Sequence, residues 1–257
     1  MRIARIAHPQ GGLAFVSLEG EGADQVAREI ADHPFGTPVF TGRSWPLADC
    51  RLLAPTLPSK IVCIGKNYAD HAEEMGGQAP ADPVIFMKPS TSVIGHNEVI
   101  RLPADSTRVD FEGELALVMN PSPRGVTAAN AHRAILGYTI ANDVTARDQQ
   151  AHDGQWTRAK SHDSFCPLGP WIQTGIDPGD LDIKTTLDGA VKQDSSTAFL
   201  LHSIPEIVEW VSSVMTLLPG DVILTGTPAG VGPMTAGQSV SVSISGIGTL
   251  TNTVAKR

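Results

Sequence analysis

The sequence predicts a β-rich mixed α/β fold with short helices. Segments with strand-like alternation or short apolar runs outnumber segments with helical spacing. Turn residues separate them throughout, and the chain holds 25 glycines and 19 prolines. This pattern favours a β-rich mixed fold over a doubly wound parallel sheet. With 257 residues, the chain is long enough for one large domain, or for a main domain with a small appendage.

Residues 1–55 are expected to form a small N-terminal α+β module, and residues 56–257 the main domain. Segments 1–7 and 13–20 alternate and are separated by HPQGG, which predicts a β-hairpin. Residues 23–33, ADQVAREIADH, have helical spacing. The two prolines in APTLPS then mark the boundary between this module and the main domain.

Strands and short helices alternate along the main domain. Short apolar runs predict the strands, and apolar residues at helical spacing or polar segments between turns predict the helices. A Gly/Pro turn is expected at 121–125. The expected strands are 60–65, 84–89, 109–120, 136–144, 221–224 and the alternating tail 238–254, and the expected helices are 67–77, 128–135, 145–153 and 204–215.

Two of these helices carry more specific signals. In the helix at 67–77, Asp70 is the expected cap and Glu73 its capping-box partner, with Gly76-Gly77 at the end. The helix at 204–215 is amphipathic. Its expected buried stripe is Ile207, Val208, Val211, Val214 and Met215.

Charge and cysteine content exclude several classes of protein. The formal net charge is −8, which argues against nucleic acid or an anionic membrane as the main partner. The three cysteines form no CxxC pair, which fits a reducing compartment. The N-terminus lacks the apolar core of a signal peptide, and no apolar run is long enough to span a membrane. We therefore expect a cytoplasmic protein.

The stretch VDFEGEL places Asp110, Glu112 and Glu114 at alternate positions of an expected strand, hence on one face. Two carboxylates about 6 Å apart repel by roughly 3 kcal/mol at an effective dielectric constant near 20. Protonation, pairing with Arg or Lys, or a bound cation would relieve this repulsion. An edge strand with solvated acids is the alternative.

Asp143 supplies a further acid where the strand at 136–144 gives way to a polar segment. Two Glu and one Asp form an oxygen-only set that suits Mg²⁺ or Mn²⁺ better than Zn²⁺. A role for Asp143 as a helix N-cap is the alternative.

Three further features are candidates for chemistry. His71 and Glu74 lie three residues apart on one helical face, as a general-base pair or as a surface ion pair. Lys160 is either an anchor for a carboxylate or enolate oxygen, or a solvated lysine. Thr227 lies in the glycine-rich LTGTPAGVG, which is either a carboxylate-binding loop or a simple turn.

The order of these motifs resembles the fumarylacetoacetate hydrolase superfamily. The resemblance runs from about residue 60 to the C-terminus, and its most specific parts are VDFEGELALV, GYTIANDVTARDQQ and LTGTPAGVG. It implies the short form of the family, a β-sandwich and β-roll core, a homodimer, and one Mg²⁺ or Mn²⁺ in each active site.

The resemblance also implies roles for individual residues. It implies that the metal ligands are Glu112, Glu114 and Asp143, which leaves Asp110 as a supporting acid. It implies that His71 and Glu74 form a water-activating pair on a lid, with Lys160 beside the metal. The implied substrate-binding residues are Arg147, Gln150, Thr227, Tyr68 and Lys88.

One block departs from the family pattern. The lysine block often reads KGFDT in the family and is KSHDS here, with His162 and Ser164 in place of an aromatic and a threonine. We expect a more polar edge of the pocket from this change. We expect the change to affect substrate specificity and to leave the metal site intact.

The expected function is a metal-dependent enzyme that acts on 2-oxo (1,3-dicarbonyl) carboxylic acids. It would cleave a C–C bond through a metal-stabilised enolate, as an acylpyruvate hydrolase or oxaloacetate decarboxylase does. The alternative is a 2-hydroxyhepta-2,4-diene-1,7-dioate isomerase/decarboxylase of aromatic catabolism. A non-catalytic metal-binding protein is the third possibility.

Overall fold

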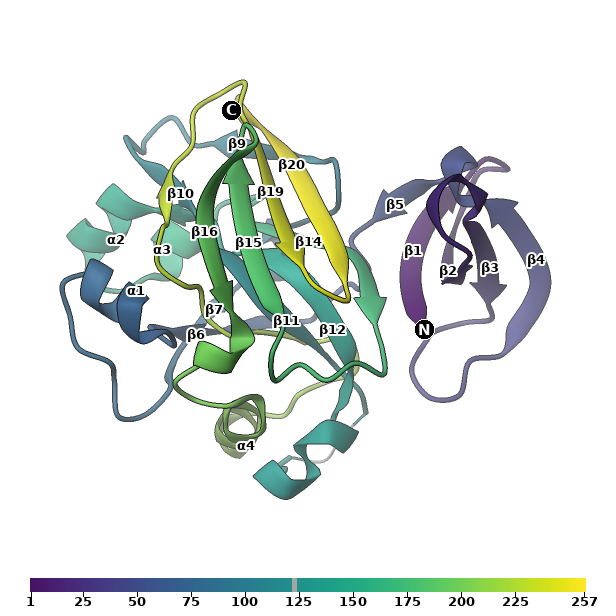
Figure 1. The fold of residues 1–257 in the computed structure, drawn as a ribbon, viewed down its shortest axis with the longest axis horizontal. Helices are drawn as coiled ribbons and strands as arrows, with labels where there is room; N and C mark the ends of the chain where they lie inside the picture. Colours follow the sequence, from purple (N-terminus) through teal and green to yellow (C-terminus); the bar gives the residue numbers. More distant parts are fainter. Residues whose placement is uncertain (122–123) are drawn as a thin grey trace.

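The computed structural model describes residues 1–121 and 124–257, and its main feature is a large, mostly antiparallel sheet (Figure 1). Part of the expected Gly/Pro turn, Ser122 and Pro123, lies outside the described residues. The sheet contains, in spatial order, β4 (Phe40–Pro46), β3 (Val26–Ile30), β2 (Gly12–Glu19), β1 (Arg2–His8), β14 (Cys166–Gln173), β12 (Ile135–Asn142), β11 (Gly113–Met119), β17 (Val222–Leu224), β6 (Ile61–Gly65) and β7 (Val84–Lys88), with β5 (Arg51–Leu53) beside β1 and β8 (Val93–Ile94) beside β14.

The N-terminal strands β1 to β5 lie to one side of the rest of the chain (Figure 1). They belong to the large sheet, because β1 pairs with β14. The expected hairpin is present as β1 and β2. The helix expected at 23–33 is wrong, because residues Val26–Ile30 form β3 between β2 and β4. A bulge between Arg28 and Ile30 produces the uneven apolar spacing that imitates a helix.

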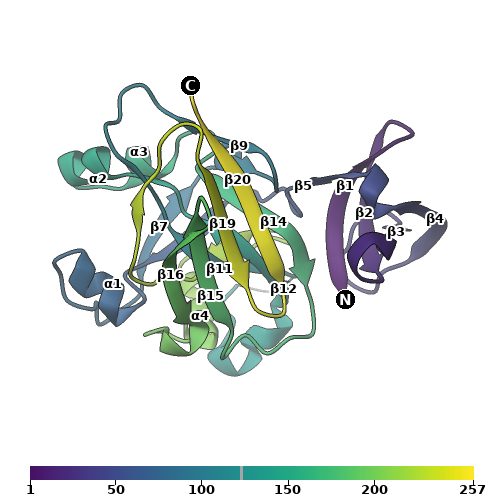
Figure 2. The same ribbon diagram turned by 45° about the horizontal axis from the view of Figure 1, so that its top comes forward.

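A second sheet packs over the large one, and the main apolar core lies between them (Figure 2). Residues of β11, β15 and β19 contact one another in this core, together with α4. The β-rich mixed fold is thereby confirmed. The second sheet contains, in spatial order, β16 (Ala190–Ser196), β15 (Asp182–Leu187), β19 (Ser239–Ile244), β20 (Gly248–Lys256) and β9 (Val99–Leu102).

The helices are short, as expected. The α-helices are α1 (Ala69–Glu74), α2 (Arg147–Asp153), α3 (Thr157–Lys160) and α4 (Ile204–Val214), and the 3₁₀ turns are η1 (Gly22–Asp24), η2 (Leu47–Asp49), η3 (Ser90–Ser92), η4 (Ala128–Arg133) and η5 (Thr197–Phe199). None of the helices described is long and apolar enough to cross a membrane.

Two details of the helices differ from expectation. In α4, Ile207, Val208 and Val211 are buried and Met215 packs against the core, but Val214, the last residue of the helix, is exposed. In α1, the cap position is Tyr68, and its side chain makes no capping bond. The Asp70 carboxylate instead accepts a bond from the N–H of His71, inside the first turn.

The acidic segment at 109–120, expected as one strand, is not continuous. It breaks at Glu112 into β10 (Val109–Phe111) and β11, and β10 joins a small third sheet with β13 (Thr145–Ala146) and β18 (Gly232–Pro233). The break accompanies a close approach at Gly113, where a Cβ atom would lie 2.3 Å from Oγ1 of Thr185 on the second sheet. Glu112 therefore lies where the three-stranded sheet meets the large one.

Candidate metal and substrate site

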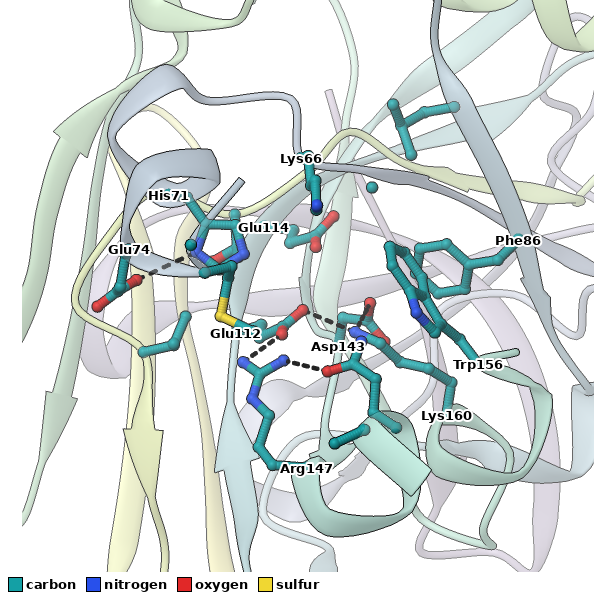
Figure 3. Close-up of a pocket in the computed structure, with 18 of the residues that line it drawn as sticks. Lys66, His71, Glu74, Phe86, Glu112, Glu114, Asp143, Arg147, Trp156 and Lys160 are labelled. Carbon is teal, nitrogen blue, oxygen red and sulfur yellow. Dashed lines mark hydrogen bonds and ion pairs between the residues drawn. The ribbon is translucent and has the colours of Figure 1, made fainter. Parts of the chain in front are cut away.

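A cavity of about 610 Å³ opens between α1, the end of β6, and helices α2 and α3 (Figure 3). It gathers nine of the eleven candidate residues from segments far apart in the sequence. These nine are His71, Glu74, Glu112, Glu114, Asp143, Arg147, Gln150, Lys160 and Thr227.

Three carboxylates form the floor of this cavity. Oxygens of Glu112, Glu114 and Asp143 all lie within 4.8 Å of one another, and all three side chains are buried. Backbone bonds fix the two segments that carry them. The N–H of Asp143 donates to the Glu112 carbonyl at 2.8 Å, and the N–H of Glu112 donates to Oδ1 of Asn142 at 2.9 Å.

Cationic side chains surround two of the three carboxylates. Nζ of Lys160 donates to Glu112 at 2.8 Å and to Asp143 at 2.6 Å. Nη2 of Arg147 lies 2.5 Å from Oε1 of Glu112, and Lys88 forms an ion pair with Asp143. Glu114 has no ion-pair partner among the described residues, and it accepts one bond, from the N–H of Gly226 at 2.7 Å.

This asymmetry moves two neighbouring pKa values in opposite directions. Burial opposes ionisation of Glu112, but Lys160 and Arg147 outweigh it and hold its pKa below the usual range. Burial raises the pKa of Glu114 well above its usual value, and the charges of Asp143 and Glu112 raise it further. Glu114 is thus the carboxylate of the floor whose charge no cationic side chain of the described residues balances.

The residues present fit a hard divalent cation. The three potential ligands are carboxylates, close enough to share one ion, and the described part of the chain places no Cys or His within this group. A cation here would relieve the repulsion that raises the pKa of Glu114. The acidic triad can therefore hold a metal such as Mg²⁺ or Mn²⁺.

His71 and Glu74 face this floor from α1. Nδ1 of His71 lies 3.1 Å from Oε2 of Glu74, as expected for two residues on one helical face. His71 is near enough to Glu112 to contribute to lowering its pKa. The N–H of Gly230 donates to Oε1 of Glu74 at 3.1 Å, which links α1 to the glycine-rich loop across the cavity.

Arg147 and Gln150 extend from α2 into the cavity. Nη1 of Arg147 donates to Oε1 of Gln150 at 3.0 Å, and Nε of Arg147 donates to Asp110 at 2.9 Å. Arg108 binds the same carboxylate through two bonds of 2.9 Å. Asp110 is therefore a supporting acid that orients Arg147, as the resemblance implied, and it lies outside the carboxylate triad.

Thr227 is held from the second sheet by a residue that sequence reasoning missed. Its hydroxyl donates to the Gly113 carbonyl at 2.9 Å and accepts from Nε2 of Gln193 at 2.7 Å. Gln193, fully buried in β16, also donates to the Pro228 carbonyl and accepts from the Gly113 N–H. It thus joins the backbone between the two glutamates to the glycine-rich loop.

Two candidates lie outside the cavity lining. Lys88 is buried behind the floor and contacts Asp143 and the carbonyl of Val144, the latter at 3.1 Å. Tyr68 is buried at the start of α1, and burial raises its pKa, with Glu114 adding to the effect. Lys88 thus supports the floor from behind, and Tyr68 lies at the start of α1.

The two substituted residues of the lysine block, His162 and Ser164, also lie outside the cavity lining. Nε2 of His162 lies 2.8 Å from Oε1 of Gln149, and Oγ of Ser164 accepts from the N–H of Arg101 at 2.8 Å. The expected polar edge of the pocket is therefore wrong. These side chains bond to other parts of the fold, Gln149 and the backbone of Arg101.

An aromatic wall completes the cavity, and no sequence signal indicated it. Phe86 and Trp156 pack edge to face with ring centroids 5.1 Å apart. Nζ of Lys160 lies 5.0 Å from the centroid of Phe86. Lys66 also lines the cavity and was missed, although it directly precedes the NYADHAEEM motif.

The fold and this site define an enzyme, and comparison with known proteins identifies its family. Residues 60–255 match the model of the fumarylacetoacetate (FAA) hydrolase C-terminal family, and residues 1–55 match that of the Rv2993c-like N-terminal family. The chain belongs to the fumarylacetoacetate hydrolase superfamily, as the resemblance implied.

Relatives of this chain carry several activities. Protein Rv2993c of Mycobacterium tuberculosis is 62% identical, covering 100% of this chain and 99% of the relative. Oxaloacetate tautomerase YisK of Bacillus subtilis is 40% identical over 82% of this chain and 75% of its own length.

Solved structures that are similar to this chain also belong to enzymes of different activities. That of 2-hydroxyhepta-2,4-diene-1,7-dioate isomerase from Mycobacterium marinum is 60% identical and superposes with a TM-score of 0.94, covering 100% of this chain and 99% of the other. Maleylpyruvate hydrolase from Sphingobium sp. SYK-6, in complex with manganese(II) and pyruvate, is 28% identical, with a TM-score of 0.80 and the same coverage. Tautomerase, isomerase and hydrolase thus occur on one fold.

Proposed function

We propose that this enzyme acts on 2-oxo carboxylic acids of the 1,3-dicarbonyl type and cleaves a C–C bond through an enolate. Acylpyruvates and oxaloacetate are the proposed substrates, by hydrolysis and decarboxylation respectively. The observation that carries this proposal is the placement of a buried carboxylate triad, Lys160 and the His71–Glu74 pair around one cavity.

Each group has a distinct proposed role. A divalent cation on Glu112, Glu114 and Asp143, Mg²⁺ or Mn²⁺, would supply Lewis-acid stabilisation of the enolate when bound. Lys160 donates hydrogen bonds beside it and adds positive charge where negative charge develops. Arg147, Gln150 and Thr227 orient the carboxylate end of the substrate.

The His71–Glu74 pair supplies the base. In the neutral ring of His71, a proton on Nδ1 would be donated in a hydrogen bond to Glu74, and Nε2 would be the nitrogen that can accept a proton. In the hydrolase reaction, Nε2 takes a proton from water as the water attacks the distal carbonyl. Decarboxylation needs no attacking water, so the pair has no such role there.

A second candidate function is isomerisation or tautomerisation without C–C cleavage, including the isomerase/decarboxylase activity of aromatic catabolism. The names of the relatives favour it: the isomerase structure is 60% identical and the oxaloacetate tautomerase 40% identical, whereas the hydrolase is only 28% identical. Both candidates need the same enolate and differ in the step that follows it.

Further assignments belong to this proposal. We propose a homodimer and a two-part organisation, with residues 1–55 as the N-terminal module and 56–257 as the catalytic domain. The division is supported by the family matches, which leave a gap at 56–59. A cytoplasmic location is supported by Cys63 and Cys166, which are buried thiols without a disulfide.

Product analysis on a small panel tests the proposal. The purified protein, stripped with EDTA and reloaded with Mg²⁺ or Mn²⁺, is incubated with acetylpyruvate, oxaloacetate and 2-hydroxyhepta-2,4-diene-1,7-dioate. Pyruvate formed from either of the first two supports C–C cleavage. Tautomer or isomer exchange alone supports the second candidate. Bound metal without turnover of any of the three supports a non-catalytic metal-binding protein.

A further inference from the structure

Lys66 occupies a constrained backbone position at the cavity. It follows the last residue of β6 with a φ of 56°, in the left-handed region that disfavours side chains with a Cβ. The next residue is anchored: Nδ2 of Asn67 donates to the Thr225 carbonyl at 2.8 Å, and its carbonyl accepts from Leu201 at 2.9 Å. Backbone strain held by its surroundings in this way is a feature of functional positions.

The ammonium group of Lys66 differs from the other cations that line the cavity. Arg108 pairs with Asp110, Arg147 with Asp110 and Glu112, and Lys160 with Glu112 and Asp143. Lys66 has no ion pair with any residue in the described ranges 1–121 and 124–257, although it lines the same cavity. Its positive charge is therefore left for a ligand.

The position of this charge indicates which part of a ligand it meets. Figure 3 shows Lys66 and Arg147 on opposite sides of the three carboxylates. Nζ of Lys66 also lies against the end of the lid, where a Cβ atom at Gly77 would come within 2.9 Å of it. An anion beside Lys66 would thus lie under the lid, away from Arg147 and Gln150.

We infer that Lys66 binds a second carboxylate, so that this site selects dicarboxylic over monocarboxylic 2-oxo acids. The inference rests on the proposed function, in which Arg147 and Gln150 receive the first carboxylate. A charge-assisted bond from a lysine to a carboxylate in a cavity of this kind contributes enough to change affinity about tenfold. Lys66 is a specificity-determining residue for the distal carboxylate.

Malate and lactate test this inference without turnover. Both present a carboxylate and a hydroxyl for chelation, and only malate carries a distal carboxylate. Calorimetric titration of the Mg²⁺-loaded protein is expected to show malate binding about tenfold more tightly than lactate. Lys66→Met should remove most of this preference with little change for lactate, and Lys66→Arg should retain it. The exposed Lys256→Met is the matched control.

The outcomes separate the two proposals. Equal affinities in the wild type, or an unchanged preference in Lys66→Met, overturn the role of Lys66 and leave the proposed function standing. Failure of both ligands to bind in the presence of Mg²⁺ overturns the inference together with the proposed function. If the enzyme turns over oxaloacetate and acetylpyruvate, Lys66→Met should raise KM for oxaloacetate about tenfold and leave KM for acetylpyruvate unchanged.

Discussion

The floor of the cavity and the helix above it are built in contrasting ways. The floor carboxylates are buried and come from segments fixed by sheet and backbone hydrogen bonds. The lid helix α1 has six residues, is largely exposed, and reaches the far wall through the bond from Gly230 to Glu74. Under the proposed function this contrast corresponds to two roles, in which the floor stabilises charge and α1 supplies the base. Substitutions should separate the two functions.

The largest expected effect is on the floor. Glu114→Gln keeps the shape and the acceptor for the Gly226 N–H but removes the charge that only a cation can balance. We expect metal-dependent activity to fall at least about a thousandfold, roughly 4 kcal/mol of transition-state stabilisation. Titration calorimetry should show a matching loss of Mg²⁺ affinity, with an unchanged circular dichroism spectrum.

Glu73→Gln is the matched control, because Glu73 is an exposed lid carboxylate outside the cavity lining. It should behave as the wild type in both assays. Full activity in Glu114→Gln would show that the acidic triad is not the metal site.

His71→Gln tests the lid. It removes the base while leaving the three carboxylates in place, so hydrolytic kcat should fall by about a hundredfold to a thousandfold. Mg²⁺ affinity should stay within about twofold of the wild type, measured by the same calorimetry. A large loss of Mg²⁺ affinity would contradict the division between floor and lid. Retained decarboxylation alongside lost hydrolysis would sharpen it.

Gln193→Leu tests the connection between the floor and the glycine-rich loop. It leaves the buried N–H of Gly113 without its acceptor and removes one of the two bonds to the hydroxyl of Thr227, which keeps its bond to the Gly113 carbonyl. We expect about 2 kcal/mol lower stability in denaturant titrations and roughly a tenfold lower kcat/KM. The exposed Gln78→Leu serves as the control. A loss of stability with unchanged kinetics would make Gln193 purely structural.

The smallest effect concerns α2, which carries Arg147 and Gln150. Partial burial raises the pKa of Asp148, but bonds from Ser106 Oγ (2.7 Å) and Thr107 N–H (2.9 Å) outweigh it and lower the value to about 2. Since the folded pKa lies below the ordinary value of 3.8, the stabilisation is complete above pH about 4 and is lost as the pH falls toward 2.

Asp148→Asn should therefore be less stable than the wild type near neutral pH and lose less stability between pH 4 and 2. Thermal unfolding followed across this range measures the difference, with the exposed Asp82→Asn as control. Parallel pH profiles for the wild type and Asp148→Asn would contradict the assignment.

The floor was more predictable from sequence than its surroundings. The acids at 110, 112 and 114 and the position of Asp143 at a strand end are local patterns, and they predicted a cluster of carboxylates. The break at Glu112 was not predictable, because it accompanies packing of Gly113 against Thr185, a contact between residues far apart in the chain. Long-range contacts of this kind also bring Gln193 to Thr227.

In the N-terminal module, one prediction from local sequence was correct and one was wrong. Its hairpin was predicted because both strands alternate next to a turn. The helix at 23–33 was wrong because strand pairing with β2 on one side and β4 on the other outweighs weak helical spacing. Lys66 and the aromatic wall of Phe86 and Trp156 carry no periodic signal, so only the folded chain reveals their place.

The interruption at Glu112 has a thermodynamic consequence. It puts one carboxylate of the triad between the three-stranded and the large sheet, while Glu114 lies within β11 and Asp143 follows β12. An ion held by all three would tie these segments together as a cross-link that the unfolded chain lacks. At a free concentration of about 100 times Kd, such linkage adds roughly 2.7 kcal/mol to the free energy of unfolding. Metal supply would then set the stability of the folded enzyme as well as its catalytic rate.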